Sequence, residues 1–254
     1  MIIGSWNVNS IKARMEHVKT WLEANKPDVL MIQELKGEVF PADEFEKLGY
    51  GSAAVGQKAY NGVATLSRHK IETGLQKLPG DDSDEQARYL ETIINGVRLI
   101  NIYLPNGNPV DSEKFPYKLR WMDRLKTRLR ELRIANDPFL VGGDFNVIPE
   151  DADCYDPKAW AGDALFRTES RKSLRSIINL GLTDAFRIYH AGGGHYTFWD
   201  YQAGAWPKNH GIRIDHILLS PVLADRLQSC AIDRTPRGQE KASDHTPILA
   251  VISD

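Results

Sequence analysis

The stretch Ile2-Ile3-Gly4-Ser5-Trp6-Asn7-Val8 carries apolar and β-favouring residues and is predicted to form a buried strand. A helix is predicted next: Ser10 can cap it, its apolar side chains recur at residues 11, 15, 18 and 22, and Pro27 ends it. The apolar run Asp28–Gln33 follows and is predicted to be a second buried strand. A strand, a helix and a strand in succession are typical of an α/β protein.

The rest of the chain alternates in the same way. Further strands are predicted over residues 62–67, 88–94, 97–104, 139–142, 196–199, 213–219, 231–234 and 248–252, and further helices after Pro116 and over about 168–180. Asn95-Gly96 lies between two of these strands and is a strong hairpin signal. This mixture predicts an α/β fold with two packed mixed β-sheets flanked by helices. Because no Gly/Ser-rich or Pro-rich linker divides the chain, residues 1–254 are predicted to form one domain.

The composition indicates a soluble globular protein. With 42% hydrophobic and 26% charged residues in 254, the chain does not resemble a disordered, collagen-like or coiled-coil protein. Its first residues turn polar too early for a signal peptide, and no apolar run approaches the roughly 20 residues that span a bilayer. The two cysteines, Cys154 and Cys230, lack metal-ligand spacing. We therefore expect a cytoplasmic protein without a membrane partner.

The net charge seems at first to argue against a nucleic-acid partner. Lys and Arg total 32 against 34 for Asp and Glu, a formal charge of -2, whereas phosphate binding is largely electrostatic. Basic residues nevertheless concentrate in the stretches 114–133 and 167–175. The near-zero net charge therefore excludes a uniformly basic protein that binds nucleic acid without selectivity, but it does not exclude a protein that binds DNA through one face.

Polar side chains follow the predicted strands at several of their ends. Each one alone is typical of a turn, and Asp215, inside an otherwise apolar strand, needs a partner. As a set they combine hard oxygen ligands that suit Mg²⁺, carboxamides that bind phosphate, and a histidine that a carboxylate can orient. The set predicts metal-assisted phosphoryl chemistry, and its members are Asn7, Asn9, Glu34, Tyr103, Asn106, Asp144, Asn146, Asp215, Asp244 and His245.

Six motifs in sequence order resemble those of exonuclease III. They are Trp6-Asn-Val-Asn9, Ile32-Gln-Glu34, Asn101-Ile-Tyr-Leu-Pro-Asn-Gly107, Gly143-Asp-Phe-Asn146, Arg213-Ile-Asp-His216 and Ser243-Asp-His-Thr-Pro247. Exonuclease III is the bacterial member of the endonuclease/exonuclease/phosphatase superfamily and is related to the abasic-site endonucleases. The resemblance spans nearly the whole chain. It implies a four-layer α/β sandwich that acts as a monomer on double-stranded DNA with abasic sites or blocked 3′ ends, with Mg²⁺ as cofactor and Mn²⁺ as a substitute.

The resemblance also implies a role for each residue of the set. Glu34 would be the principal metal ligand, with Asn7 shaping the metal's surroundings and Asp244 close to the metal. Asp144 would orient or deprotonate the attacking water, positioned by Asn146, and Tyr103 and Asn106 would contact the phosphate. His245 would bind a non-bridging oxygen, with Asp215 behind it. Whether Asp144 or a hydroxide on the metal is the base stays open.

Further residues are predicted to contact the substrate. Phe198 would line the pocket, Trp206 would be a wedge, and Asn9 would lie near the metal and the DNA. Ile212 occupies a position where eukaryotic relatives carry Trp, and it would form a smaller wall for an extruded sugar. Lys114 and Lys118 would bind backbone phosphates. The sequence departs from those relatives in two loops, which carry Asn108-Pro109 and the acids Glu150, Asp151, Asp153 and Asp156.

These features predict a DNA-repair nuclease. It would hydrolyse the phosphodiester on the 5′ side of an abasic site and would also act as a 3′→5′ exonuclease and a 3′-phosphatase or phosphodiesterase. An alternative in the same superfamily is a phosphoesterase for inositol phosphates or lipids. A DNA-binding module without catalysis is disfavoured because the set of acidic residues is complete.

Overall fold

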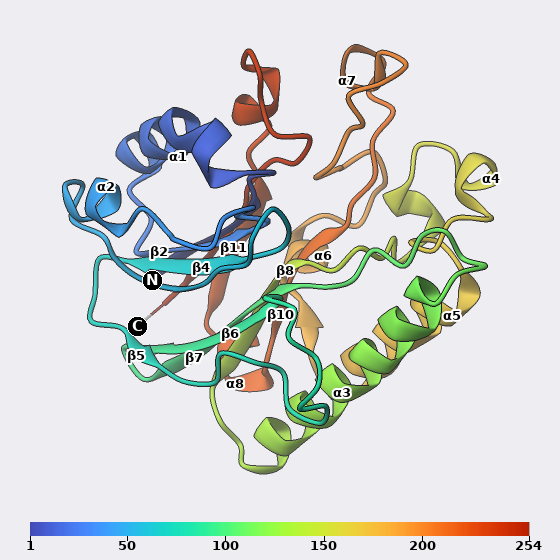
Figure 1. Cartoon of the computed structure of the whole chain (residues 1–254). Coiled ribbons are helices and arrows are strands. Elements are labelled where there is room, and N and C mark those ends of the chain that lie inside the picture. The colour runs from blue at the N-terminus through green and yellow to red at the C-terminus, as the bar shows by residue number, and fades with distance from the viewer. Residues whose placement is uncertain (254) are drawn as a thin grey trace.

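The computed structural model describes residues 1–253, which form two six-stranded sheets packed face to face (Figure 1). The first sheet contains, in spatial order, β11 (Leu227–Ile232), β12 (Ile248–Ile252), β1 (Ile2–Asn7), β2 (Val29–Gln33), β4 (Val63–Ser67) and β3 (Gly51–Val55). The second contains β5 (Glu72–Thr73), β6 (Tyr89–Ile94), β7 (Val97–Tyr103), β8 (Phe139–Asp144), β10 (Asp215–Leu219) and β9 (Thr183–Asp184). Each sheet mixes parallel and antiparallel pairs, which confirms the predicted fold class.

Helices cover both outer faces of this pair of sheets. The helices of the described residues are α1 (Ile11–Asn25), α2 (Ala42–Glu46), α3 (Lys114–Ile134), α4 (Pro157–Trp160), α5 (Thr168–Ile178), α6 (Ala185–Tyr189), α7 (Ala205–Lys208) and α8 (Pro221–Ala224). α1 and α2 lie on the first sheet, and α3 and α5 on the second (Figure 1). Apolar side chains such as Met31 and Leu140 fill the space between the sheets. The result is the four-layer sandwich that the resemblance implies.

Two glycines at the end of β8 allow a close approach that a larger residue would block. A Cβ on Gly142 would lie 2.6 Å from the Met31 side chain in the facing sheet. Gly143 has a φ of +144°, and its Cβ would lie 2.0 Å from the backbone oxygen of Ile102 on the neighbouring strand. The Gly-Gly pair therefore lets β8 fit between its neighbours just before Asp144.

Most of the predicted elements are present. The Ser10 side chain accepts a hydrogen bond from the backbone N–H of Ala13 at the start of α1, and Asn95 and Gly96, both at positive φ, connect β6 to β7. The strand predicted over residues 196–199 is wrong, because only Phe198 makes bridges there. β11 also begins before the predicted residue 231. α3 begins at Lys114, before Pro116, whose missing N–H costs nothing in a first helical turn.

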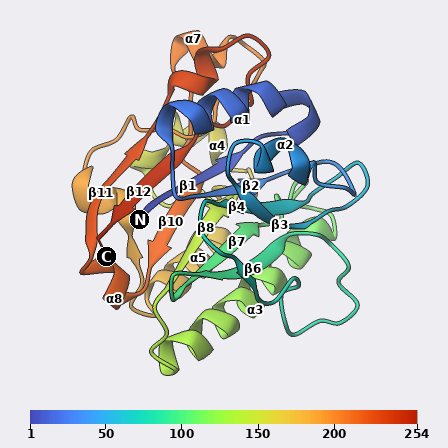
Figure 2. The same ribbon diagram turned by 90° about the vertical axis from the view of Figure 1, so that its left-hand side faces the viewer.

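The strand ends that carry the predicted site residues meet at one end of the molecule. β1 runs parallel to β2, and β7 runs parallel to β8 with Tyr103 opposite Asp144. β10 runs antiparallel to β8, so that its first residue, Asp215, also lies opposite Asp144. The chain termini lie at the other end of these strands, where the Ile252 N–H donates to the Met1 carbonyl (Figure 2). Within residues 1–253, no helix has the length and apolar character needed to cross a membrane.

Candidate active site

A cavity of about 260 Å³ opens where the ends of β7, β8 and β10 meet. Most of its polar lining was predicted from the sequence, and the complete lining consists of Glu34, Tyr103, Asn106, Asn108, Asp144, Asn146, Trp160, Asp163, Leu165, Phe198, Asp200, Ile214, Asp244 and His245. The two sheets and the loops after them therefore bring together residues that are far apart in the sequence.

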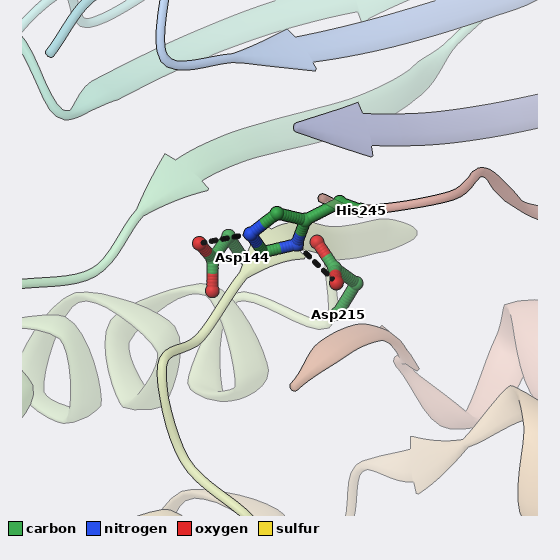
Figure 3. Close-up of side chains that lie close together, drawn as sticks. All are labelled: Asp144, Asp215 and His245. Carbon is green, nitrogen blue, oxygen red and sulfur yellow. Dashed lines mark hydrogen bonds and ion pairs between the residues drawn. The ribbon is translucent and has the colours of Figure 1, made fainter. Parts of the chain in front are cut away.

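His245 lies between two carboxylates at the base of this cavity (Figure 3). Its Nδ1 lies 2.8 Å from Oδ2 of Asp215, and its Nε2 lies 3.8 Å from Oδ2 of Asp144. All three side chains are buried, with exposed fractions of 0% for Asp215, 2% for Asp144 and 4% for His245. They form an acid–histidine–acid chain in which Asp215 fixes the orientation of the imidazole ring.

Burial and neighbouring charges shift the pKa values of Asp144 and His245. Burial raises the pKa of Asp144, and with the nearby charge of Asp215 it outweighs the effect of His245, so that this pKa reaches about 7. For His245, burial lowers the pKa, but the charges of Asp215 and Asp144 outweigh it and raise the pKa to about 10. His245 is therefore an imidazolium at neutral pH. It can donate a hydrogen bond to an anion, and Asp144 is poised to accept a proton.

Asn7 holds two of the acids in place. Its Nδ2 donates to Oε2 of Glu34 and to Oδ2 of Asp144, at 3.0 Å in both cases. Its Oδ1 accepts a hydrogen bond from the backbone N–H of Asn9, at 2.9 Å, and this bond fixes which way the amide points. Asn7 therefore turns its NH₂ group, and not its oxygen, toward Glu34 and Asp144, and it orients these two acids.

Asn146 and Asn106 link the loops that follow β8 and β7. Asn106 Nδ2 donates to Asn146 Oδ1 at 3.1 Å, and Asn146 Nδ2 donates to the Leu104 carbonyl at 2.9 Å. The backbone N–H of Asn146 also donates to Oδ1 of Asp144 at 2.8 Å. Asn146 adopts a positive φ of 47°, which asparagine tolerates better than most residues. This geometry places two carboxamides beside the buried carboxylate.

Glu34 and Asp244 are the carboxylates best placed to hold a metal. Glu34 is 17% exposed and pairs with Lys36, whose Nζ lies 3.0 Å from Oε1. Asn9 connects the two acids, because it donates to Asp244 Oδ1 at 3.0 Å and accepts from Lys36 Nζ at 2.6 Å. Carboxylate oxygens therefore line the cavity, and the ammonium group of Lys36 lies against Glu34. Oxygen ligands of this kind fit a hard divalent cation.

The acid–histidine–acid chain is a second group that could hold a metal ion. One ligand atom from each of Asp144, Asp215 and His245 lies within 4.8 Å of the others. A protonated imidazole has no lone pair to offer, and His245 Nδ1 is engaged by Asp215. Glu34 and Asp244 are therefore the better candidates for metal ligands.

Tyr103 and Phe198 line the cavity beside the acids. Burial, together with the charges of Glu34 and Asp144, raises the pKa of Tyr103 well above its ordinary value, so that the phenol stays protonated and remains a hydrogen-bond donor. The Phe198 ring packs edge-on against the His245 ring, with 5.0 Å between the centroids. Both residues occupy positions compatible with contact to a substrate.

The structure does not support two of the predicted substrate contacts. Ile212 is fully buried, with its backbone paired to that of Phe198, and Ile214 lines the cavity instead. Trp206 packs edge-on against Trp199 and carries the guanidinium groups of Arg234 and Arg237 over its ring, 5.0 and 5.4 Å from the centroid. Trp206 is therefore part of a packed cluster and does not project as a free wedge.

Two further predicted contacts are placed differently from expectation. The prediction for Lys118 is wrong, because its side chain is fully buried and donates to the backbone carbonyls of Asn106 and Asn146. The amide of Asn9 is engaged by Asp244 and Lys36, so that Asn9 orients the acidic site rather than projecting toward DNA. Lys114 is exposed and lines a neighbouring cavity next to Asn106, where a phosphate contact stays a prediction.

Sequence reasoning missed several residues of the site. Lys36 pairs with Glu34, and Trp160, Asp163 and Leu165 form one wall of the cavity. Asn108 ties this wall to the loop after β7, because its Nδ2 donates to Asp163 Oδ1 at 3.0 Å. The wall belongs to the segment around α4, which carries no motif of its own. Only the two-residue distance between Lys36 and Glu34 signals any of these contacts in the sequence.

Comparisons with known proteins agree with one another. Residues 4–245 match the profile of the Endonuclease/Exonuclease/phosphatase family. The chain is 34% identical to an exodeoxyribonuclease III from Haemophilus influenzae over 260 residues, which cover 97% of each chain. Its fold matches the 3′ phosphatase NExo from Neisseria bound to a product DNA hairpin, with a TM-score of 0.94, and an AP endonuclease from Archaeoglobus fulgidus, with a TM-score of 0.95. Each of these two proteins is 38% identical in sequence to this chain, and each alignment covers 100% of both chains.

Proposed function

Because the chain belongs to the endonuclease/exonuclease/phosphatase family, we propose that its site hydrolyses phosphate esters of damaged DNA. The chain is a DNA-repair nuclease of the exonuclease III and AP endonuclease type. Its substrate is duplex DNA with an abasic site, which it cuts on the 5′ side, or with a blocked 3′ end, from which it removes the phosphate or nucleotide. One site serves these reactions because each of them cleaves a phosphate ester next to a damaged or terminal sugar.

The observation that carries this proposal is the acid–histidine–acid chain at the base of the cavity. Two of its members, whose side chains lie 3.8 Å apart, differ in charge: Asp144 is a proton-accepting carboxylate and His245 is an imidazolium. A phosphate placed next to this pair would meet both a base for the attacking water and a cation for its non-bridging oxygen. Hydrolysis of a phosphodiester needs both groups at once.

Each residue of the site then has a role that its geometry supports. Asp144 takes a proton from water, whose oxygen attacks phosphorus while the bond from phosphorus to O3′ breaks, and the departing O3′ takes up a proton from the solvent. His245 donates from Nε2 to a non-bridging oxygen, and Asp215 keeps the ring charged and oriented. Tyr103, Asn106 and Asn146 hold the phosphate by donating hydrogen bonds.

The family is metal-dependent, and we assign the metal to Glu34 and Asp244, with Asn7 and Asn9 orienting these acids. Mg²⁺ bound there would neutralise charge on the phosphate, and Mn²⁺ would substitute for it. The oxygen donors favour such hard cations over Zn²⁺. Lys36 must turn its ammonium group away from Glu34 when the cation binds, which its partly exposed side chain permits.

The alternative, a phosphoesterase for inositol phosphates or lipids, is not favoured, because the matched relatives are nucleases. An assay with two phosphomonoesters separates the two functions. We expect Mg²⁺-dependent release of phosphate from a duplex oligonucleotide with a 3′-phosphate, and release at least ~100-fold slower from inositol hexakisphosphate, because only DNA offers contacts beyond the phosphate. EDTA should abolish release, and Mn²⁺ should restore it. Comparable rates on the two substrates would refute the assignment to DNA.

We also propose a cytoplasmic location and action as a monomer. Cys154 and Cys230 are both buried free thiols, a state that suits a reducing compartment. The side chains that line the cavity all come from one chain, so that a single copy has the whole site.

A further inference from the structure

Lys118 crosses from α3 to the back of the two loops that carry Asn106 and Asn146. Its Nζ donates to the Asn106 carbonyl at 3.0 Å and to the Asn146 carbonyl at 2.5 Å. Its stem packs against Gly107, where a Cβ would lie only 2.7 Å from the Lys118 Cδ. One ammonium group therefore joins the loop after β7 to the loop after β8.

These contacts connect Lys118 to the reacting groups through short steps. The carbonyl that it holds at Asn146 belongs to the residue whose backbone N–H donates to Asp144 Oδ1 at 2.8 Å. The carbonyl that it holds at Asn106 belongs to the residue whose side chain donates to Asn146 Oδ1 at 3.1 Å. Lys118 does not line the cavity, so that it can act on a substrate only through these loops.

The burial of Lys118 is energetically unfavourable. Its side chain is 0% exposed, and within residues 1–253 no carboxylate lies within ion-pair distance, 4.0 Å, of its Nζ. Its neighbours on the same helical stripe, such as Met122 and Leu125, are apolar core residues. Burial lowers the pKa of its amino group to about 7, and keeping this group in such a place lowers stability relative to an apolar side chain of similar length. Residues that lower stability in this way are found at functional sites.

We propose that Lys118 is a positioning residue of the nuclease site. By holding the two carbonyls it sets the separation of the Asn106 and Asn146 loops, and with it the place of the phosphate relative to Asp144. This inference rests on the proposed function, because it concerns the same reaction. It assigns Lys118 to the chemical step, and not to the binding of DNA or to the stability of the fold.

The test compares Lys118→Met with Lys126→Met, a lysine farther along the same helix whose side chain holds no loop. Single-turnover cleavage of an abasic duplex is measured with saturating enzyme and Mg²⁺. We expect Lys118→Met to slow the chemical step by about 10- to 100-fold, because small displacements of reacting groups have effects of this size. DNA affinity should change by less than about threefold, and Lys126→Met should behave as the wild type. The thermal midpoint should change little, because the loss of the buried amino group offsets the loss of the donor to the two carbonyls.

A double-mutant cycle supplies a readout that a purely structural role would not produce. In the Asn106→Ala background, Lys118→Met should slow cleavage by a clearly smaller factor than in the wild type. The hydrogen bond from Asn106 to Asn146, through which Lys118 acts in part, is already absent in that background. Lys118→Gln keeps a hydrogen-bond donor on a shorter side chain, so its cleavage rate should lie between those of Lys118→Met and the wild type.

Several results would overturn this inference. A normal cleavage rate in Lys118→Met would do so, and so would a lower rate that is fully explained by a lowered melting temperature. The same holds if the effects of Lys118→Met and Asn106→Ala on the rate simply multiply, or if neither Lys118→Met nor Lys118→Gln folds. Absence of metal-dependent cleavage by the wild-type protein would refute the proposed function and this inference with it. An active wild type with an unimpaired Lys118→Met would refute this inference alone.

Discussion

Asp144→Asn is expected to lower the rate of abasic-site cleavage by on the order of 10³-fold or more, the largest effect of any single change at this site. Asparagine keeps the size of the side chain and an oxygen acceptor for the Asn146 N–H, but it cannot take a proton from water. DNA affinity should remain within about threefold of the wild type or become tighter, because one negative charge leaves a cavity that receives a phosphate. Single-turnover kinetics and equilibrium binding of the same abasic duplex measure the two quantities separately.

Asp123→Asn on the exposed side of α3 is the matched control, since it removes one acidic charge outside the cavity. It should leave the rate and the affinity unchanged. If Asp144→Asn cuts at more than about a tenth of the wild-type rate, Asp144 is not the base, because general-base catalysis contributes at least about 100-fold.

Asp215→Asn is expected to slow cleavage by about 100-fold or more near pH 8 and to move the pH–rate profile to lower pH. In the wild type, the rate should rise as Asp144 loses its proton, around its pKa of about 7, and should fall as His245 loses its proton, around its pKa of about 10. The Asp215 charge raises both of these pKa values. Its removal should therefore shift both limbs of the profile downward, by roughly one unit or more.

The comparison requires rates of the chemical step from pH 5 to pH 11 for the wild type and for Asp215→Asn, with melting temperatures measured over the same range. A variant that is slower by one constant factor at every pH would show that Asp215 only positions His245. A shift of the profile to higher pH would contradict the assigned charge states. His245→Ala should remove the alkaline limb, because the titrating imidazolium is absent.

The central strands could be predicted from the sequence because they are mostly buried apolar runs bounded by polar or turn residues. β1, β2, β8 and β12 are apolar runs followed or preceded by turn signals, and β6 and β7 are joined by Asn95-Gly96. β5 and β9 have two residues each and give no pattern. The segment Tyr196–Trp199 has strand-like composition, but it forms no strand, because its bridges are confined to Phe198, which pairs with Ile212 on one side and His245 on the other.

The polar part of the site could be predicted because it lies at the ends of those strands. The sequence could not show which side chains are covered by residues from other parts of the chain. Ile212, at the position where eukaryotic relatives carry Trp, suggested a cavity wall, but it is fully buried and its backbone pairs with those of Phe198 and Cys154. Trp206 suggested a wedge, but Arg234 and Arg237 come to its ring from a segment almost thirty residues away.

Lys118 is a case in which the sequence did contain the signal. Residues 118, 122, 125, 129 and 132 recur at helical spacing, and the last four are apolar. This periodicity places Lys118 on the buried stripe of α3, whereas its charge suggested a phosphate contact. A lysine on an apolar stripe indicates a buried amino group with specific acceptors, and here the acceptors are two backbone carbonyls.

The most direct test of the central claim is the mapping of a single nick. A duplex oligonucleotide with one tetrahydrofuran abasic analogue, labelled at its 5′ end, is incubated with the protein and either Mg²⁺ or EDTA. We predict one Mg²⁺-dependent cut immediately 5′ to the analogue, which leaves a 3′-hydroxyl on the labelled fragment, and no cut with EDTA. A cut on the 3′ side, a cut that persists with EDTA, or an intact duplex after exposure to Mg²⁺ would contradict the account.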